Sequence, residues 1–526
     1  MRDDPYWINI TELMQKGVGE FIKELISNPE LGPRLQDYIN RLNAIEGIKS
    51  IDLHIDEVTG ANKTVDVVVD IFNRVNSGGT KLSKGDLALA KICAGWPEAR
   101  VEMKKRLEKW RQAGFNFQLD WFLRNINTVL TGEALFSALE HVKIEEFKYT
   151  ITLAEKTIDY ILNIISSRLG LSHTRVLGSR YSFPLMSRYL VHHGGKLTDS
   201  RERDRLLYWY VHTFLWGRYA GSTESVLNRD LGLIEVNDGH GLDRLIQELR
   251  QNRGDLRLHA NDFQGSSKGA RFYPMIYMLT RVCHACDWES GSELSEHMLG
   301  GMSALELHHI FPKARLYDHG YNRSEVNAIA NFTFLTKETN LSISDRDPAI
   351  YLADIERNNP GVLESHWIPM DHNLWSVERY HDFLAARREL LAQTANHFLE
   401  GLIEGAVPET AEVSITERTV EAVPGGVTTE AEEEVLNEFN EWVVAKGLPE
   451  GEFLYELTDE ATHRPIAILD LAWPDGLQSG LSQPVALLLD EETGTIEAAS
   501  LAGFKCFTEL SVFKHYVERD VLALTA

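Results

Sequence analysis

Hydrophobic residues recur at helical spacing over most of the first 400 positions. Between Ile10 and Leu25 apolar residues stand three and four apart, with Phe21 and Ile22 on the inner side of the expected helix. The apolar run over residues 65–75 fits a buried helix better than an alternating strand, and Ser83-Lys84-Gly85-Asp86 supplies a capping pattern for the next helix. The pattern predicts a mainly helical N-terminal part.

Amphipathic helices are also expected between residues 130 and 300. The aromatic side chains of residues 205–219 fall on several helical faces, which favours a core helix over a base-stacking platform. The same region is rich in basic side chains, which form either a phosphate-tracking surface or an ordinary solvated helix face. These side chains are Arg201, Arg203, Arg205, Arg250, Arg253, Arg257, Lys268 and Arg271.

The pattern changes near residue 400. A last long helix is expected from Trp375 to Leu402, and residues 403–430 are rich in Thr, Val, Glu, Pro and Gly without periodicity, as in a linker. A helix at 435–444, buried strands at 465–470 and 485–489, and a helix at 511–521 then predict a small separate α/β domain.

Composition limits the class of protein. The chain has 526 residues, of which 43% are hydrophobic and 25% charged, as in globular proteins with several domains. We find no apolar run of membrane-spanning length and no secretory signal, and the four cysteines are too few and scattered for a disulfide framework. These features predict a cytoplasmic protein with no membrane partner.

The net charge of −25 is unevenly distributed. Residues 401–526 hold 25 acidic and 6 basic side chains, which leaves a balance of only −6 for the first 400 residues. A nearly neutral body can present a basic groove to nucleic acid, since local charge governs binding.

The strongest chemical signal lies between Glu306 and Asn340. Residues 306–313 read Glu-Leu-His-His-Ile-Phe-Pro-Lys and predict a short strand, and Phe332–Leu335 predicts a second strand. Asp347-Pro348 supplies a cap and a first-turn proline for a following helix. This order of two strands and a helix is typical of the ββα-metal, or HNH, nuclease unit.

Phosphodiester hydrolysis needs a base, a cation and groups that hold both. His309 can serve as the general base, while His308 and Asn340 can hold Mg²⁺ or Mn²⁺ and leave positions open for phosphate and water. Asn331 can brace the segment that carries His309, and Glu306 is either a further ligand or a residue that orients a ligand. Adjacent strand residues face opposite sides, so the two histidines converge on one phosphate only if the strand is distorted.

Here the chain resembles the GmrSD-type restriction endonucleases. The segment 305–352 is similar to their HNH domain, with His-His-Ile-Phe-Pro-Lys at 308–313 followed by Asn331, Leu335-Thr336 and Asn340. Residues 71–83, which read Ile-Phe-Asn-Arg-Val-Asn-Ser-Gly-Gly-Thr-Lys-Leu-Ser, resemble the other half of these enzymes. The two resemblances frame about residues 1–400.

The resemblance implies a modification-dependent nuclease of antiphage defence with a nucleotide-hydrolysing N-terminal domain of ParB/sulfiredoxin type. The Asp-Gly-Gln-Gln-Arg signature of that nucleotide site does not occur in this sequence. The sequence therefore does not support a nucleotide cofactor. It fits an N-terminally shortened member or one that relies on a separate partner subunit.

Two weaker patterns have ordinary explanations. Cys283-His284-Ala285-Cys286 has zinc-ligand spacing, but without a second pair it is more typical of a buried helix with incidental thiols. In the C-terminal domain Asp470, Asp490 and Glu491 lie near strand ends, as in PD-(D/E)xK nucleases, but the required carboxylate and lysine are missing. The pattern favours an inactive relative or an unrelated interaction module.

The sequence therefore predicts an α+β protein with a mostly helical body, a ββα-metal module and a small C-terminal α/β domain. The expected divisions are 1–120 (the C-terminal part of a ParB/sulfiredoxin-type domain), 121–300 (helical), 301–402 (HNH nuclease with closing helix), 403–430 (linker) and 431–526 (acidic α/β). The expected function is metal-dependent cleavage of foreign or modified DNA, with a partner subunit or homo-oligomer as further partners. The alternative is a non-catalytic DNA-binding sensor or regulatory subunit of a defence system.

Overall fold

The structure is a computed structural model, and it is described here for part of the chain. The described residues are 8–27, 34–51, 84–219, 223–236, 238–265, 271–295, 305–405, 430–458, 465–474, 476–478, 482–489, 491 and 493–522. The helix expected at 65–75, the family-like stretch 71–83, and residues 406–429 of the expected linker lie outside them. Contacts divide the chain into two units, Met1–Lys63 and Thr64–Ala526.

The first unit contains three short helices around a small core. They are α1 (Ile10–Lys16), α2 (Val18–Ser27) and α3 (Leu35–Glu46), followed by the turn η2 (Gly47–Ser50). Leu13, Val18 and Leu42 are buried between them. The single helix expected from Ile10 to Leu25 is wrong, because Gly17 takes a φ of 79° and ends α1 with a hydrogen bond to the carbonyl of Leu13.

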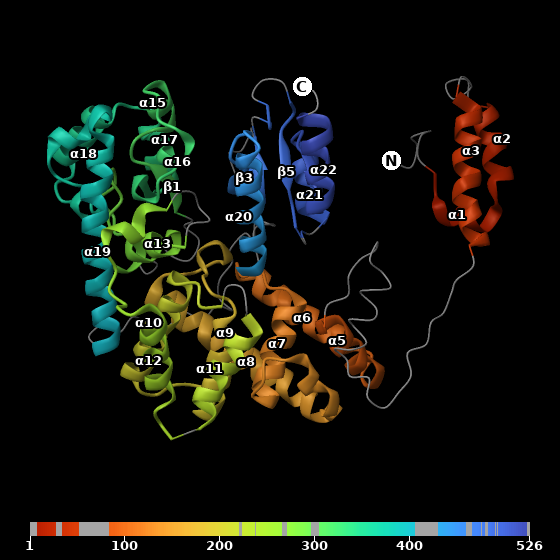
Figure 1. Cartoon of the computed structure of the whole chain (residues 1–526), viewed down its shortest axis with the longest axis horizontal. Helices are drawn as coiled ribbons and strands as arrows, with labels where there is room; N and C mark the ends of the chain where they lie inside the picture. Colours follow the sequence, from red (N-terminus) through yellow and green to blue (C-terminus); the bar gives the residue numbers. More distant parts are fainter. Residues whose placement is uncertain are drawn as a thin grey trace. The chain divides into compact units, whose positions relative to one another are not determined.

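Helices build the body of the second unit, and they share one hydrophobic core that runs from Ala88 to Leu402. Figure 1 shows their arrangement. In chain order these helices are α5 (Lys84–Gly95), α6 (Ala99–Gln112), α7 (Leu119–Thr131), η3 (Phe136–His141), α8 (Ile144–Leu169), η4 (Thr174–Val176), α9 (Ser182–His192), α10 (Ser200–Leu215), α11 (Thr223–Glu235), α12 (Gly241–Arg253), η5 (Ala260–Gln264) and α13 (Tyr273–Val282).

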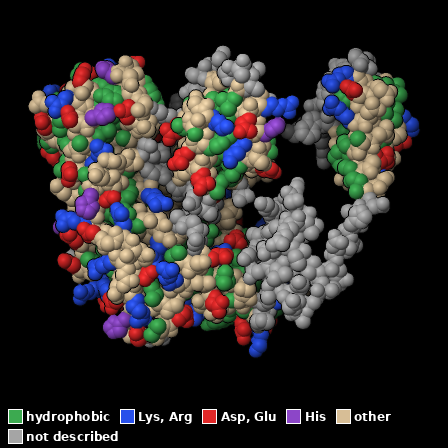
Figure 2. Space-filling view, in the orientation of Figure 1, with side chains coloured by type: hydrophobic (Ala, Val, Ile, Leu, Met, Phe, Trp, Pro, Cys, Tyr) green, Lys and Arg blue, Asp and Glu red, His purple; other side chains and the backbone are tan. Residues whose placement is uncertain are grey.

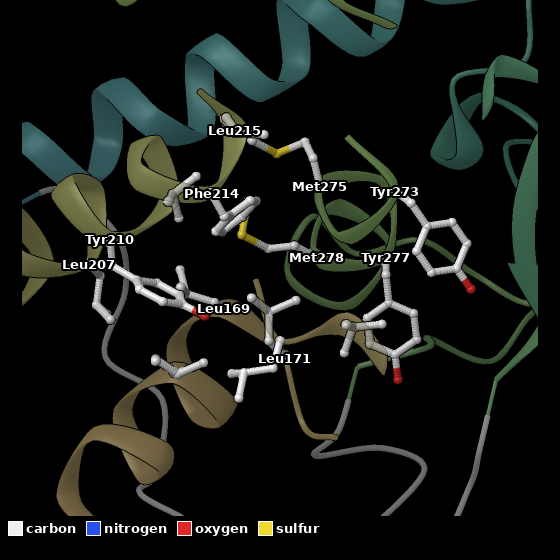
Figure 3. Packing of buried hydrophobic residues seen from close by; sticks show 14 of the residues in the cluster. Leu169, Leu171, Leu207, Tyr210, Phe214, Leu215, Tyr273, Met275, Tyr277 and Met278 are labelled. Carbon is white, nitrogen blue, oxygen red and sulfur yellow. The ribbon is translucent and has the colours of Figure 1, made fainter. Parts of the chain in front are cut away.

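The aromatic-rich helix α10 lies inside this core, as the sequence predicted. Trp209 and Tyr210 are completely buried, and Phe214 is 5% exposed. Figure 3 shows Tyr210 and Phe214 among side chains of α8 and α13, including Leu169 and Met278. These aromatic rings are therefore not available to stack on nucleic-acid bases.

A small two-stranded sheet and the short helices around it follow α13. Strand β1 (Glu306–His309) pairs antiparallel with β2 (Phe332–Leu335). The surrounding elements are α15 (Lys313–Asp318), α16 (Arg323–Val326), η6 (Ile329–Asn331), α17 (Lys337–Ile343), α18 (Pro348–Asn358), η7 (Glu364–His366), η8 (His372–Trp375), η9 (Val377–Arg379) and the long α19 (Tyr380–Glu404). Helix α18 begins as predicted, with the Asp347 side chain accepting from the N–H of Ala349.

Residues 430–522 form a four-stranded sheet with helices. The strands lie in the order β3 (Glu452–Thr458), β4 (Pro465–Trp473), β5 (Val485–Leu487), β6 (Lys505–Phe507). The first three are antiparallel, and β6 is parallel to β5. The helices are α20 (Glu430–Ala445), α21 (Thr493–Leu501), α22 (Leu510–Tyr516) and η11 (Val517–Val521). Their apolar side chains form two clusters that draw no residue from the helical body.

The described structure is mostly helical with two small sheets, which confirms the predicted α+β class at this level. Among the described helices, none has the length and apolar character needed to cross a membrane. Figure 2 shows acidic and basic side chains interspersed over the visible face of the helical body. This mixture agrees with the nearly balanced charge of the first 400 residues.

Candidate functional site

The regular pairing of β1 and β2 determines which way the predicted site residues face. His308 lies opposite Thr333 and His309 opposite Phe332, without a bulge in the register. Because side chains alternate along a strand, Glu306 and His308 share one face and His309 leaves the other. The distortion that would turn both histidines to one side is not present in this strand.

Asn340 reaches His308 from the short helix α17, an element that the sequence did not predict. Its Oδ1 atom lies 2.8 Å from Nδ1 of His308, and its Nδ2 donates to Oε2 of Glu306 at 2.9 Å. A carboxylate can only accept, so Glu306 fixes the amide orientation and turns the carbonyl oxygen toward His308. Three of the predicted site residues therefore meet at one point.

The imidazole of His308 is held in its neutral form. It is 3% exposed, and burial lowers its pKa to about 4 against the opposing effect of the bond to Asn340. Its Nε2 is buried without a hydrogen-bond partner, and the ring lies edge-to-face with Trp288 at a centroid distance of 5.5 Å. Because the amide oxygen of Asn340 accepts, Nδ1 carries the ring proton here, and a cation at Nδ1 would require that proton to leave this nitrogen.

His309 has a different neighbour, Asn327, which the sequence analysis missed. Nε2 of His309 lies 3.1 Å from Oδ1 of Asn327, and its ring packs edge-to-face on Phe332. The amide oxygen accepts, so Nε2 carries the proton and Nδ1 keeps the basic lone pair. The only sequence signal for Asn327 is its position four residues before Asn331.

Asn331 ties the segment after His309 to β2. It is completely buried, and its Oδ1 accepts from the N–H of Phe311 at 2.8 Å. Its Nδ2 donates to the carbonyl oxygens of Phe311 and Val326, each at 3.1 Å. The hydroxyl of Tyr351 adds a bond to the carbonyl of Ile310. These bonds hold the chain just beyond His309 in one conformation.

A buried guanidinium supports the chain where β2 begins. Nη1 of Arg387, on α19, lies 2.7 Å from the carbonyl oxygens of both Ala330 and Phe332, and Nη2 donates to the carbonyl of His366. Burial lowers the pKa of Arg387 to about 9, so the group remains charged near neutral pH. Helix α19 thereby fixes the start of β2.

His308 and Asn340 fit the requirements of a small divalent cation. Two ligand atoms bound to one Mg²⁺-sized ion at right angles lie about 2.9 Å apart, and the two atoms here are 2.8 Å apart. Within the described ranges no three His, Cys, Asp or Glu side chains gather as a metal cluster, so a cation here would use one imidazole and one amide oxygen. Such a pair leaves most positions open, as a catalytic ion requires.

The weaker candidates differ from this site. Helix α13 ends at Val282, so the helix expected through Cys283–Cys286 is wrong there: the segment is a turn in which His284 has a φ of 58°. Burial raises the pKa of the Cys283 thiol to about 12, and Nδ1 of His284 lies 3.0 Å from Oε1 of Glu293. The thiol is therefore protonated near neutral pH, which disfavours metal binding.

In the C-terminal domain Asp470 is completely buried on β4, and its Oδ2 accepts from the N–H of Leu489. Burial and then the nearby Glu491 and Glu432 raise its pKa well above the usual range. Asp490 lies outside the described residues.

Several of the basic side chains considered for phosphate contact have acidic neighbours. Arg203 pairs with Asp204, Arg205 with Asp243, and Arg253 with Asp262. The guanidinium of Arg253 also lies over the ring of Trp216. Lys268 lies outside the described residues. These pairs favour the solvated-face interpretation for this part of the body.

Comparison with known proteins gives one distant relative. The chain is 23% identical over 378 residues to an uncharacterized protein of Methanocaldococcus jannaschii, a match that covers 64% of this chain and 60% of the relative. The chain thus spans about three fifths of the length of that protein. No family model matches the chain.

Proposed function

We propose that this protein is a metal-dependent HNH endonuclease that hydrolyses phosphodiester bonds of DNA. The observation that carries the proposal is the 2.8 Å contact between Nδ1 of His308 and Oδ1 of Asn340, which come from β1 and α17. Both positions also match the motif of the HNH domain in GmrSD-type enzymes, which this segment resembles. Both supports point to the same pair.

His308 and Asn340 would hold the cation, for which Mg²⁺ and Mn²⁺ are the preferred candidates. When bound, such an ion polarises the scissile phosphate and offsets its developing charge. His308 is uncharged near pH 7, so a cation at Nδ1 would have to displace only the one ring proton that Nδ1 donates to Asn340. Glu306 keeps the amide oxygen of Asn340 directed toward the site.

His309 would act as the general base. The bond from its Nε2 to Asn327 puts the ring proton on that nitrogen, so Nδ1 is the basic nitrogen that would take the proton of the attacking water. The water oxygen then bonds to phosphorus as the bond to the leaving oxygen breaks. Asn331 holds the backbone beyond His309 and so limits the movement of this base.

We place the proposed substrate at the end of β1, because the two histidines face opposite sides of that strand. His309 is the last residue of the strand, and its pairing with β2 stops there. A phosphate that crosses this end can be approached from both faces of the strand. In this arrangement, access from the C-terminal end of β1 takes the place of a distortion in the strand.

Foreign or modified DNA is the proposed substrate, as in the resembling restriction enzymes of antiphage defence. The charge distribution permits it, because most of the net charge of −25 lies beyond residue 400. The acidic C-terminal domain would repel DNA, which favours a protein contact or autoinhibition for that domain. The sequence leaves open a separate partner subunit or a homo-oligomer.

A non-catalytic DNA-binding sensor is the second candidate. It is favoured by the regular register of β1, which turns His309 away from the face that carries His308. In such a protein the strand pair and helix would bind DNA without cutting it. The two candidates differ in whether any metal supports cleavage.

A metal-titrated plasmid-nicking assay on the full chain tests the proposal. The wild-type protein is expected to cut in Mg²⁺ or Mn²⁺, and His309→Ala should lower the rate at least about 100-fold. DNA affinity and thermal stability should stay unchanged. His240→Ala, which removes a histidine with a 71% exposed side chain in the helical body, is the matched control and should cut like wild type.

The assay compares unmodified plasmid with modified phage DNA. Cleavage of the modified substrate alone would establish modification dependence. Wild-type rates from His309→Ala would remove the assigned base. Tight DNA binding without cleavage at any metal concentration would favour the sensor instead.

A further inference from the structure

A tight turn that precedes β1 in the sequence lies against the proposed metal-binding pair. The backbone N–H of Asp287 donates to the carbonyl of Ser292, and its own carbonyl accepts from Gly291. Cys286 and Glu293 form an isolated antiparallel bridge at the base of this turn. The turn is thus a closed structure that presents Asp287, Trp288 and Glu289 in sequence.

The carboxylate of Asp287 holds the beginning of α17. Its Oδ2 accepts from the N–H and the hydroxyl of Thr336 at 3.1 and 2.7 Å, and its Oδ1 accepts from the hydroxyl of Thr339 at 2.6 Å. Thr336 is the N-cap residue of α17, and its own side chain makes no capping bond. A carboxylate 49 residues earlier in the chain therefore anchors this helix end.

Asp287 remains ionised although it is completely buried. Burial acts to raise the pKa of Asp287, but hydrogen bonds from Thr339, Ser290 and Thr336 outweigh it and leave the pKa below the usual value. A charged acceptor forms stronger hydrogen bonds than a neutral one. Negative charge also suits the N-terminal end of a helix.

The next two residues of the turn contact His308 and the helix that carries Asn340. The buried ring of Trp288 lies edge-to-face with His308. The carboxylate of Glu289 accepts from the hydroxyl of Ser342, two residues after Asn340 on α17. The amide of Asn359 also holds the turn in place, since its Nδ2 donates to the carbonyls of Trp288 and Glu289 at 3.0 and 2.9 Å.

Helix α17 needs such support because it contains only seven residues. A helix of two turns is unstable by itself in water. Thr339 stands directly before Asn340, so its bond to Asp287 and the Ser342–Glu289 bond secure the helix on both sides of the proposed ligand. The position of the Asn340 amide relative to β1 therefore depends on this turn.

We propose that Asp287 is a positioning residue that sets the His308–Asn340 pair by anchoring α17 through Thr336 and Thr339. The inference rests on the proposed function, in which this pair holds the cation. A residue that orients a metal ligand changes metal affinity without touching the metal. A residue that only stabilises the fold changes stability alone.

The experiment compares metal affinity with stability in the full chain. Asp287→Asn keeps the shape and removes the charge. Asp230→Asn is the control, because Asp230 is equally buried but is held by Arg218 and Tyr219 in the helical body. We expect Asp287→Asn to raise the Mn²⁺ dissociation constant, measured by electron paramagnetic resonance, about 10- to 100-fold. Asp230→Asn should lower the unfolding temperature and leave Mn²⁺ affinity unchanged.

Milder variants address the case in which Asp287→Asn fails to fold. Thr339→Val removes the hydroxyl at constant shape and should weaken Mn²⁺ binding about fivefold or more. Thr339→Ser retains the hydroxyl and should bind within about twofold of wild type. The pair separates loss of the bond to Asp287 from loss of side-chain volume.

A measurement without metal keeps this inference separate from the proposed function. In the metal-free protein the ring-nitrogen NMR signal of His308, assigned with His308→Gln, should report the Nδ1–H form bonded to Asn340. Asp287→Asn and Thr339→Val should convert it to mixed forms, whether or not the wild type binds Mn²⁺ or cuts DNA. An unchanged His308 signal in both variants would overturn the positioning role. Absence of Mn²⁺ binding by wild type would instead remove the proposed function.

Discussion

The carboxylate of Glu306 accepts from the side-chain amide of Asn340 at 2.9 Å, and the carbonyl oxygen of that amide lies 2.8 Å from Nδ1 of His308. Glu306 and His308 lie two residues apart on one strand face, while Asn340 comes from a helix 32 residues beyond His308. This contact decides the orientation of the amide. It also bears on whether Glu306 is a ligand or an orienting residue.

Substitutions at Glu306 distinguish these two roles. Glu306→Gln retains an oxygen that can accept from Asn340, so an orienting role predicts Mn²⁺ affinity within about threefold of wild type. Glu306→Ala frees the amide to turn and should weaken Mn²⁺ binding about tenfold or more. Titration of Mn²⁺ by electron paramagnetic resonance measures both. If Glu306→Gln weakens Mn²⁺ binding as much as Glu306→Ala does, the carboxylate of Glu306 is itself a metal ligand. Glu338→Gln, at an exposed position of α17, is the control.

The buried His366 predicts a loss of stability in acid. Its Nδ1 lies 2.5 Å from Oγ1 of Thr333, and its Nε2 donates to the carbonyl of Cys286. Burial, then the charge of Arg387, lowers its pKa to about 3. The neutral form is thus favoured in the folded state, so this contribution is present above the unfolded pKa near 6.5 and is lost as pH falls toward 3.

The expected loss from His366 is at most about 1.4 kcal/mol for each pH unit below 6.5. Hydrogen exchange of the β2 amides between pH 6.5 and 4 measures the free energy of local opening. His366→Gln can still accept from Thr333 and donate to Cys286, but it does not titrate. Its opening free energy should vary less with pH than that of wild type. Equal slopes would assign the acid sensitivity to other groups, such as His308.

The C-terminal domain should become more stable when Asp470 is neutralised. Burial, then Glu491 and Glu432, raises the pKa of Asp470 well above its usual range. The contribution to stability of a carboxyl with a raised pKa is fully present below the unfolded pKa near 4. It is lost as pH rises through the folded pKa. Above the unfolded pKa this carboxyl therefore makes a smaller contribution to stability than a neutral side chain would at the same place in β4.

Asp470→Asn keeps an oxygen that can accept from Leu489 and adds an amide that can donate to Glu491. At pH 7 we expect the calorimetric transition of this domain to rise by about 4 °C or more. At pH 4 the gain should vanish. The exposed Glu441→Gln on α20 changes the net charge equally and should leave the transition in place. A lower transition for Asp470→Asn at pH 7 would contradict the prediction.

Local sequence patterns were sufficient for the elements whose signals lie within a few residues. The apolar stretch at β2, the Asp347-Pro348 start of α18 and the buried aromatic helix α10 follow from a short apolar run, capping and helical periodicity. The motif also named His308 and Asn340, which the structure brings into contact. These features depend little on distant parts of the chain.

The remaining features depend on contacts between distant segments. Helix α17 is too short to give a periodic signal and is anchored by Asp287, which lies 49 residues before Thr336. Arg387 supports the start of β2 from more than 50 residues away, and such a pairing leaves no local mark. The predicted helix from Ile10 failed for a local reason, because Gly17 interrupts a continuous apolar pattern. Propensity alone does not indicate whether a glycine will end a helix.

The anchoring of α17 from outside the strand pair has a practical result for protein engineering. A fragment limited to residues 305–358 would lack both the turn at Asp287 and the guanidinium of Arg387. Such a fragment would keep every motif residue yet lose the supports that determine their geometry. A portable cutting module from this protein would have to extend from the turn before β1 through α19.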